Sequence, residues 1–314
     1  MSYFFEYRGI TKTYPGVKAL EDVSFGVRRG AVHGLMGENG AGKSTLIRIL
    51  SGDQRADAGA IVIEGTEQHF TSVRDASDNG VIVIHQELQL VPDLTVAENL
   101  CLGRFPSRAG FISRSRMIAD VQAVLDDYGI EVDAGKRVSA LPLGARQMVE
   151  VAKAAMVKAR VIALDEPTSS LSSRESEVLF RMIARLKAEG AVILYVSHRM
   201  DEIFQLCDSM TVLRDGKLAA HHDTLKGVTR AQIVSEMVGR EISDIWNWRA
   251  RPLGETRLVV EGLAGNRLAV PGSFTARKGE ILGFFGLIGA GRSELMRLIY
   301  GADPAGAGRV VLDG

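Results

Sequence analysis

The sequence has little cysteine, no excess of charge of either sign and no long hydrophobic run. Its two cysteines, Cys101 and Cys207, are too few and too far apart for a disulfide framework or a four-ligand zinc site. Lysine plus arginine and aspartate plus glutamate both number 38, so overall charge provides no attraction to nucleic acid, and we expect no nucleic-acid partner. No hydrophobic run approaches the ~20 residues of a membrane-spanning helix, and Met1–Arg8 lacks the pattern of a secretory signal. The chain is therefore cytoplasmic in character, and any membrane contact must be made through a partner.

Short hydrophobic runs rich in β-branched residues alternate with segments of helical spacing. Such runs are typical of strands buried on both faces of a parallel sheet, and the alternation predicts an α/β fold. The runs are Val32–Met36, Ala60–Ile63, Val81–Ile84, Val161–Leu164 and Val192–Val196. Between the last two, one face of a predicted helix carries Val178, Leu179, Met182, Ile183 and Leu186.

The length of 314 residues predicts more than one domain. All of these strand-like runs lie within residues 1–245. The stretch from about 95 to 158 lacks such runs, so we interpret it as a helical subdomain inserted into the α/β core. Residues 246–256 follow neither period and contain Pro252 and Gly254, which predicts a linker to a second region at 257–314.

The region after the linker repeats part of the first domain. Val32–Gly65 aligns without gaps on Ile281–Gly314, and glycine, alanine, serine and leucine recur at corresponding positions through the loop, the following helix and the next strand. Internal repetition of this kind indicates two copies of one structural unit. We therefore expect a complete first domain and the incomplete start of a second copy, which ends before that copy could close its core.

A glycine-rich loop follows the first predicted strand of the core. It reads Gly37-Glu38-Asn39-Gly40-Ala41-Gly42-Lys43-Ser44-Thr45 and matches the pattern G-x-x-x-x-G-K-[ST] of phosphate-binding loops. Its glycines let backbone N–H groups approach a polyphosphate, and the helix that begins near Ser44 adds the positive end of its dipole. We expect Lys43 to contact the β- and γ-phosphates of ATP and the Ser44 hydroxyl to bind Mg²⁺.

Two adjacent carboxylates follow the predicted strand 161–164. An acidic residue that leaves a buried strand either lies beside a ligand at the sheet edge or is left unpaired at a cost in stability. Because a phosphate-binding loop is present, we interpret Asp165 as a direct or indirect ligand of Mg²⁺. Glu166 is then placed to orient or deprotonate the attacking water.

The segment Asp165-Glu166-Pro167-Thr168-Ser169-Ser170-Leu171, together with the glycine-rich loop, resembles the ATPase cassettes of ABC transporters. Within this resemblance, Tyr14 is similar to the aromatic residue that stacks on adenine. Gln86 is similar to the Q-loop glutamine, which senses Mg²⁺ and water and contacts the membrane partner. His198 is similar to the switch histidine at the γ-phosphate. The family more often has aspartate at the position of Ser172 in the D-loop. The implied fold is a P-loop NTPase core with an inserted helical subdomain and an antiparallel β region.

Longer segments resemble the fused, two-cassette ATPases of bacterial monosaccharide importers, and within these the L-arabinose type. The segments are Val149–Ala154, Ser169–Leu171, Ser197–Ile203, Met237–Arg240 and Gly239–Ile245 followed by Trp248. This resemblance implies an ATP-hydrolysing subunit on the cytoplasmic face of the inner membrane. The implied partners are membrane permease subunits, a second cassette and, indirectly, a periplasmic sugar-binding protein. Relatives of this kind continue for roughly another cassette length beyond Gly314.

Three alternatives stay open at this point. Because the binding protein and the permease choose the substrate, the sugar could be xylose, ribose or galactose instead of arabinose. The chain could be a nucleotide-binding fragment without transport activity. It could also be a soluble ABC-type ATPase that acts on ribosomes or DNA, which the zero net charge and the lack of a long, charged interdomain helix disfavour.

The family signature, usually L-S-x-G-Q, is altered in this sequence. It reads Leu141-Pro142-Leu143-Gly144-Ala145. Proline is well suited to the first turn of a helix, so we expect the fold to tolerate Pro142. The serine that usually stands there donates to the γ-phosphate across a dimer interface, and proline has no donor. Gly144 still permits close approach of a backbone.

The second glycine-rich loop, Gly286 to Ser293, is also altered, because Arg292 stands between Gly291 and Ser293 where the first loop has Lys43. Arginine keeps the charge but is bulkier and forked. If the two fused cassettes pair with each other, the altered signature faces the altered loop. This arrangement predicts one hydrolysing site and one degenerate site that mainly binds nucleotide.

Overall fold

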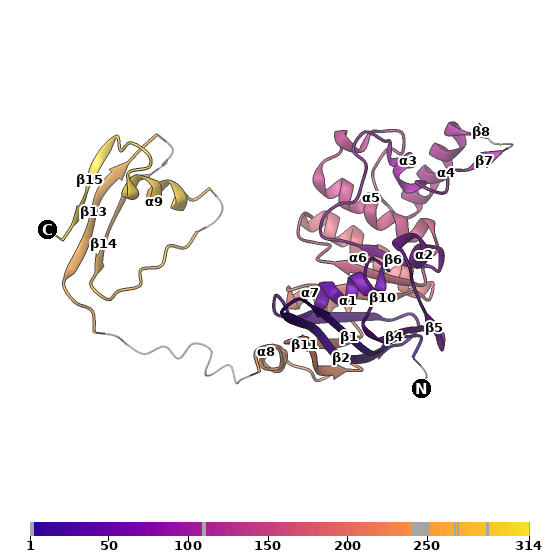
Figure 1. Cartoon of the computed structure of the whole chain (residues 1–314). Coiled ribbons are helices and arrows are strands. Elements are labelled where there is room, and N and C mark those ends of the chain that lie inside the picture. The colour runs from indigo at the N-terminus through magenta and orange to yellow at the C-terminus, as the bar shows by residue number, and fades with distance from the viewer. Residues whose placement is uncertain are drawn as a thin grey trace. The chain divides into compact units, whose positions relative to one another are not determined.

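The computed structural model describes residues 3–108, 111–239, 252–266, 268, 270–286 and 289–313. The chain divides into two compact units, Met1–Ile245 and Trp246–Gly314 (Figure 1). Of the predicted linker, only the part from Pro252 lies within the described residues, and Arg240–Ile245 and Trp248 lie outside them. Among the helices of the described ranges, none has both the length and the hydrophobicity needed to cross a membrane.

A six-stranded sheet with the order β12-β11-β3-β10-β9-β6 lies at the centre of the first unit. Its strands are β3 (Val32–Gly37), β6 (Val81–Ile84), β9 (Val161–Asp165), β10 (Val192–Val196), β11 (Ser209–Arg214) and β12 (Lys217–His222). All neighbours are parallel except β12, which runs antiparallel to β11. Alternate side chains of β9 and β10 enter two different hydrophobic cores, which explains why these strands are continuously hydrophobic. Four of the five predicted strands are thus confirmed.

The fifth predicted strand, Ala60–Ile63, belongs to a different sheet. It is part of β4 (Ala58–Ile63), which lies in an antiparallel sheet with β2 (Val17–Val27), β1 (Phe5–Tyr14) and β5 (Thr66–Gln68). The prediction of a parallel strand is therefore wrong. Only the second half of β4 is buried, against the core of the antiparallel sheet, and a hydrophobic run of that length does not reveal which strands pair with it.

Helix α1 (Lys43–Leu50) packs between the two sheets, and its four buried side chains join the core that both sheets share (Figure 1). The other face of the parallel sheet is covered by α6 (Ser173–Ala188), α7 (Met200–Leu206) and α8 (Arg230–Val238). The short α2 (Val73–Asp78) precedes β6. The predicted buried face of α6 is confirmed, because Leu179, Met182, Ile183 and Leu186 are buried and Val178 packs against the same core.

The predicted subdomain at about 95–158 is mainly helical. It contains α3 (Val96–Leu100), α4 (Arg114–Asp127), the 3₁₀ turn Val138–Ala140 and α5 (Leu143–Met156). A two-residue hairpin, β7 (Ser107–Arg108) with β8 (Phe111–Ile112), adds the only strands described in this stretch. Thr95 and Glu98 form a reciprocal capping box that fixes the start of α3. The predicted α/β core with an inserted helical subdomain and an antiparallel β region is confirmed.

The second unit contains a three-stranded sheet, β14 (Gly272–Arg277), β13 (Thr256–Ala264) and β15 (Ala307–Leu312), and helix α9 (Arg292–Tyr300). In the alignment of the repeat, α9 corresponds to α1 and β15 corresponds to β4. The counterpart of β3 differs, because residues 281–286 form no strand. In the first unit β3 is paired on both sides, by β10 and β11, whereas no strand in the described part of the second unit pairs with 281–286.

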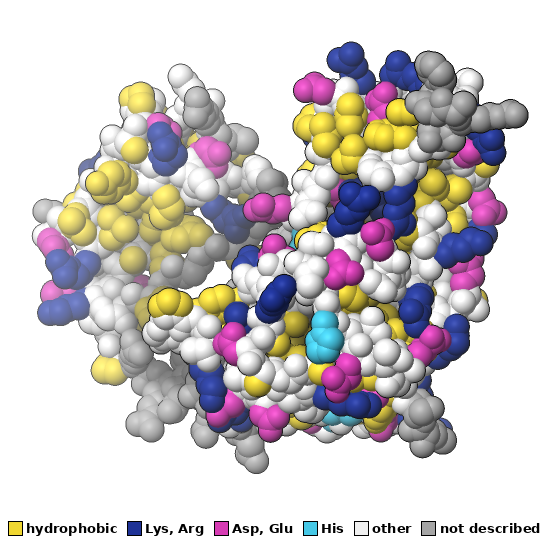
Figure 2. Space-filling view, turned by 45° about the vertical axis from the view of Figure 1, so that its right-hand side comes forward, with side chains coloured by type: hydrophobic (Ala, Val, Ile, Leu, Met, Phe, Trp, Pro, Cys, Tyr) yellow, Lys and Arg dark blue, Asp and Glu magenta, His cyan; other side chains and the backbone are white. Residues whose placement is uncertain are grey.

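Hydrophobic side chains are exposed on the second unit, and Figure 2 shows them gathered on its visible face. Ile281 and Phe285 are 85% and 102% exposed, whereas their counterparts Val32 and Met36 in the first unit are each 1% exposed. The same kind of hydrophobic side chain is therefore buried in one copy and exposed in the other, because among the described residues strands flank this segment in the first unit alone.

Candidate functional site

The glycine-rich loop, the carboxylate pair Asp165–Glu166 and His198 lie at the carboxyl ends of three adjacent parallel strands. β3 leads into the glycine-rich loop, β9 ends at Asp165 and β10 leads to His198. Asp165 pairs in register with Val196 of β10, and the Glu166 N–H donates to the Val196 carbonyl at 2.9 Å. Ligands of open α/β sheets bind at this edge, so strand order brings together segments that are far apart in sequence.

The backbone of the loop requires glycine at two positions. Gly37 has a φ of 152°, and a Cβ there would lie 2.4 Å from the Leu213 carbonyl oxygen. Gly42 has a φ of 103°, and a Cβ there would lie 2.6 Å from the Leu20 side chain. An L side chain would be strained at both positions. The loop is thus pressed against β2 and β11, with α1 beginning directly after it.

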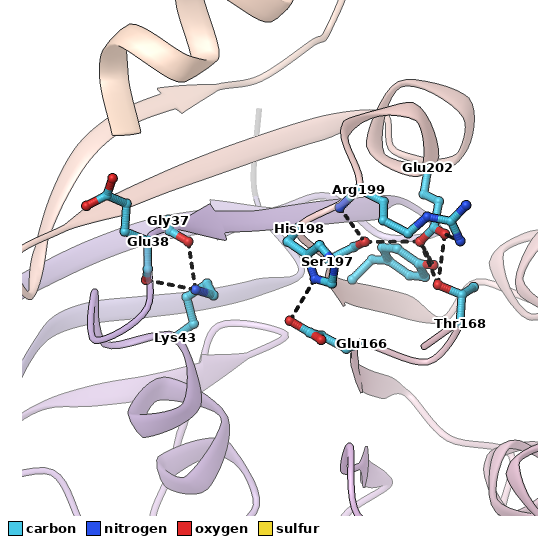
Figure 3. Close-up of polar contacts among 10 residues, drawn as sticks. Gly37, Glu38, Lys43, Glu166, Thr168, Ser197, His198, Arg199 and Glu202 are labelled. Carbon is cyan, nitrogen blue, oxygen red and sulfur yellow. Dashed lines mark hydrogen bonds and ion pairs between the residues drawn. The ribbon is translucent and has the colours of Figure 1, made fainter. Parts of the chain in front are cut away.

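Lys43 extends back across the loop that it follows (Figure 3). Its Nζ donates to the carbonyl oxygens of Gly37 at 2.7 Å and Glu38 at 3.0 Å. Burial lowers the pKa of Lys43, and the nearby carboxylates of Asp165 and Glu166 oppose that effect. The ammonium group is therefore held over the loop, beside the first turn of α1, which contains no acidic residue and whose dipole favours an anion.

A cavity of about 340 Å³ opens between the glycine-rich loop and the end of β9. It is lined by Ala19, Asn39, Gly40, Gly42, Lys43, Ser44, Thr45, Gln86, Asp165 and Glu166. The oxygen donors among them, from Ser44, Gln86 and Asp165, are the hard ligands that Mg²⁺ prefers, so the residues present fit the predicted ion. Burial and, after it, the neighbouring Glu166 raise the pKa of Asp165, whereas His85 and Lys43 lower it.

Glu166 and His198 meet at the mouth of this cavity. His198 Nδ1 lies 3.1 Å from Glu166 Oε1, and Figure 3 shows the two side chains directed toward each other. The His198 side chain is 71% exposed and that of Glu166 is 25% exposed. Glu166 has a φ of 49°, a backbone conformation that costs a non-glycine residue of order 1–3 kcal/mol. The structure thus places the Glu166 carboxylate in contact with the His198 imidazole, and Glu166 lines the same cavity as Lys43.

Tyr14 does not line this cavity. Its hydroxyl bonds Gln54, and Lys12 Nζ lies 5.8 Å from the centre of its ring. The predicted stacking of Tyr14 on adenine is therefore not prepared by its contacts in this structure and stays a prediction.

The altered signature segment differs from expectation in one detail. Pro142 is the N-cap of α5, with φ −64° and ψ 159°, and the helix begins at Leu143; the expectation that Pro142 lies within the first turn is wrong by one residue. Its carbonyl accepts the Arg146 N–H at 3.1 Å, but its side chain makes no capping bond to the helix. A Cβ at Gly144 would lie 2.1 Å from a carboxylate oxygen of Glu175. A larger residue at this position would therefore have to displace the Glu175 carboxylate.

The second glycine-rich loop has the same helix start as the first. Gly291 caps α9 with a φ of 82°, as Gly42 caps α1. Arg292 and Ser293 are exposed, Gly286 is half-buried, and the two residues after Gly286 lie outside the described residues.

Two buried glutamates near the site were not predicted. Glu202 is 4% exposed and Glu150 is 3% exposed. Glu150 Oε1 accepts the Gln89 N–H at 3.0 Å and the Lys153 ammonium at 3.0 Å, which fixes the segment after Gln86 to α5. A charged residue within the hydrophobic stretch Val149–Val151 was the available signal, since buried carboxylates are usually paired.

Comparison with known proteins identifies the first unit. The family model "ABC transporter" matches residues 20–169. Arabinose import ATP-binding protein AraG of Rhizobium etli is 68% identical over 99% of this chain, and that of Rhizobium meliloti is 67% identical over 100%. The AraG protein of Ralstonia nicotianae is 56% identical over 100% of the chain. The chain spans 62%, 62% and 61% of these proteins, about three fifths of their length.

Solved structures show the same fold. A nucleotide-free ATP-binding cassette from an ABC transporter matches with a TM-score of 0.65 and 22% identity, covering 79% of this chain and 100% of that one. An ATP-binding subunit of an ABC transporter matches with a TM-score of 0.62 and 26% identity, covering 75% of this chain and 99% of that one. The predicted fold class, a P-loop NTPase core of the ABC type, is confirmed.

Proposed function

We propose that the chain carries an ATP-binding cassette of the ABC transporter family and that it hydrolyses ATP to drive import of a monosaccharide, L-arabinose, through a membrane permease. The observation that carries the proposal is the cavity that brings Lys43, Ser44, Asp165 and Glu166 together. These residues supply a cation, an oxygen ligand pair and a base around a space bounded by glycine backbone. That combination matches what phosphoryl transfer from a nucleotide requires.

In this proposal each side chain has a separate role. Lys43 exchanges its bonds to the Gly37 and Glu38 carbonyls for bonds to the β- and γ-phosphates. Ser44, Gln86 and Asp165 hold Mg²⁺, which supplies charge neutralisation at the phosphates. Glu166 orients the attacking water and accepts its proton, and His198 holds the carboxylate from the solvent side and contacts the γ-phosphate. Tyr14 stacks on adenine after leaving Gln54.

The segment 87–98 is the proposed contact with the permease. It runs from Gln86 at the cavity to α3, and the helical subdomain holds it at two places. Glu150 accepts the N–H of Gln89, and the buried Asn99 accepts the Val91 N–H at 2.7 Å and donates to the Val91 carbonyl at 3.0 Å. A change at the nucleotide would therefore move the segment and the subdomain together. ATP then acts by its different affinity for open and closed arrangements.

The cassette of residues 1–245 is joined, we propose, to a second one that begins at 257. The support is the shared arrangement of α9 and β15, and the exposed apolar side chains at 281–285 whose counterparts are buried in the first unit. The altered signature, Leu141–Ala145, and Arg292 then fall in one nucleotide site, which binds without efficient hydrolysis. Equal hydrolysis at both sites of the longer protein would contradict this.

Arabinose is the sugar named for the relatives, and for this chain it is a proposal that needs its own test. A strain lacking the gene is supplied with the full reading frame, and uptake of labelled L-arabinose, xylose, ribose and galactose is measured. We expect L-arabinose uptake alone to be restored by the wild type and not by Lys43→Ala. Restoration of another sugar would replace arabinose, and sedimentation of the protein with ribosomes instead of membranes would contradict the importer itself.

A further inference from the structure

The carboxylate of Glu202 is buried next to the catalytic edge but does not line the cavity. It lies in α7 and is 4% exposed. Four side chains contact its two oxygens, and Figure 3 labels three of them, Thr168, Ser197 and Arg199. The Thr168 hydroxyl lies 2.8 Å from Oε1 and 3.0 Å from Oε2, and the Tyr195 hydroxyl lies 2.8 Å from Oε2. The Ser197 hydroxyl lies 3.0 Å from Oε2, and Arg199 Nη1 lies 2.5 Å from Oε1.

Every one of these partners is a donor, and an ionised carboxylate is an acceptor only. Ser197 also accepts the Arg199 N–H at 3.0 Å through its hydroxyl oxygen, so its single proton is committed to Glu202. Burial and then the charge of Glu202 raise the pKa of Tyr195, which keeps its phenol protonated as a donor. None of these groups can reverse its role as donor or acceptor without breaking a hydrogen bond of the set.

Three of the four donors come from the two loops that carry the proposed catalytic pair, and the fourth, Tyr195, lies in β10. Thr168 lies two residues after Glu166 in the loop that follows β9. Ser197 and Arg199 flank His198 in the loop that follows β10. Apart from Glu166 and His198 themselves, Glu202 is therefore the described side chain that is bonded to both loops.

We propose that Glu202 is a positioning residue that sets the distance between Glu166 and His198 by clamping their two loops. Because Glu202 does not line the cavity, its loss should change the alignment of the pair and leave the phosphate-binding loop intact. The expected effect of Glu202 on turnover rests on the proposed function, whereas its expected effect on the Glu166–His198 distance does not. A misplacement of about 1 Å caused by a residue away from the chemistry costs on the order of 10²-fold in rate.

The structural arm of the test uses the imidazole NMR signals of the whole chain, which contains six histidines. The His198 signal is assigned as the one missing in His198→Ala. Glu166→Gln, which alters its direct partner, sets the reference shift. We expect Glu202→Gln, whose amide places a donor against donors, to move the His198 signal at least half as far. Glu236→Gln is the control. Glu236 lies in α8, and its carboxylate is 2.8 Å from His222 Nε2, so this substitution should move the His222 signal alone.

The kinetic arm measures phosphate release from MgATP. We expect Glu202→Gln to lower kcat 10- to 100-fold with KM changed less than about 3-fold, and Glu236→Gln to change neither. Tyr195→Phe, which removes one hydroxyl and keeps the ring, should give a smaller effect of the same kind and serves if Glu202→Gln does not fold. An unmoved His198 signal in a folded Glu202→Gln or Tyr195→Phe chain overturns the clamp. If the His198 signal moves in these variants while the wild-type chain hydrolyses no ATP, the clamp is supported and the proposed function is contradicted.

Discussion

Replacing Glu166 by glutamine separates nucleotide binding from hydrolysis. The amide has the same size and can still bond His198 Nδ1, which lies 3.1 Å away. The φ of 49° and the bond from the Glu166 N–H to the Val196 carbonyl belong to the backbone and are kept. Only the ability to accept a proton from water is lost. General-base assistance is typically worth 10²–10⁴-fold, which corresponds to about 3 to 5 kcal/mol in the activation free energy.

The assay is phosphate release from MgATP, measured beside the affinity for ATP in the same preparation. Glu166→Gln should lose at least 100-fold in turnover while its ATP affinity stays within about 3-fold of wild type. Glu177→Gln, an exposed carboxylate on α6, is the matched control and should behave as wild type. Turnover by Glu166→Gln within 3-fold of wild type would remove Glu166 from the role of base.

Three further predictions concern the site and the core around it. Because the pKa of Asp165 is raised, binding of Mg²⁺ with ATP by the wild type should weaken on acidification at a pH above the range of an ordinary aspartate. Asp165→Asn should weaken this binding and remove the dependence on acid pH. A pH profile of binding that is the same in Asp165→Asn and the wild type refutes the assignment. Complete burial lowers the pKa of His33 to about 3, so between pH 6.5 and 3 the unfolded state binds more protons than the folded state. The free energy of unfolding should therefore fall by up to ~1.4 kcal/mol per pH unit as the pH drops through that window. In His33→Gln, the free energy of unfolding measured with urea should depend less steeply on pH. Gly144→Ala would place a Cβ 2.1 Å from the Glu175 carboxylate and disturb the cap that Glu175 forms with Ser172. We therefore expect thermal unfolding to show no stabilisation, although alanine in place of a helical glycine normally stabilises a helix by about 1 kcal/mol. A gain of that size would contradict the steric argument.

The sequence was sufficient for the part of the site that lies in local patterns. Gly37 and Gly42 stand in a fixed pattern because a phosphate loop needs their backbone, and Asp165 and Glu166 follow a recognisable buried strand. These local patterns place the candidate site at the carboxyl ends of the parallel strands, where the structure brings these residues together. The parallel register of β9 and β10 then does the rest, since it brings Glu166 and His198 together from segments that a sequence pattern lists separately.

The sequence was insufficient where partners are distant or where two environments share one pattern. Thr168 and Glu202 are 34 residues apart, and Gln89 and Glu150 are 61 apart; nothing local marks either carboxylate as a clamp. The run Ala60–Ile63 is as hydrophobic as a parallel strand, yet it lies in the antiparallel sheet. Residues 281–286 repeat the pattern of β3 without forming a strand, because backbone pairing depends on neighbours that hydrophobicity does not specify.

Calorimetric titration of the purified chain with ATP in the presence of Mg²⁺, repeated on Lys43→Ala, tests the central claim most directly. The substitution removes charged hydrogen bonds to the phosphates that are worth about 1.5–3 kcal/mol. The account therefore predicts one binding event, at the first glycine-rich loop, and an affinity for ATP that is about 10- to 100-fold lower in the variant. No heat of binding from a folded wild-type chain, or equal affinity of the two proteins, would contradict it.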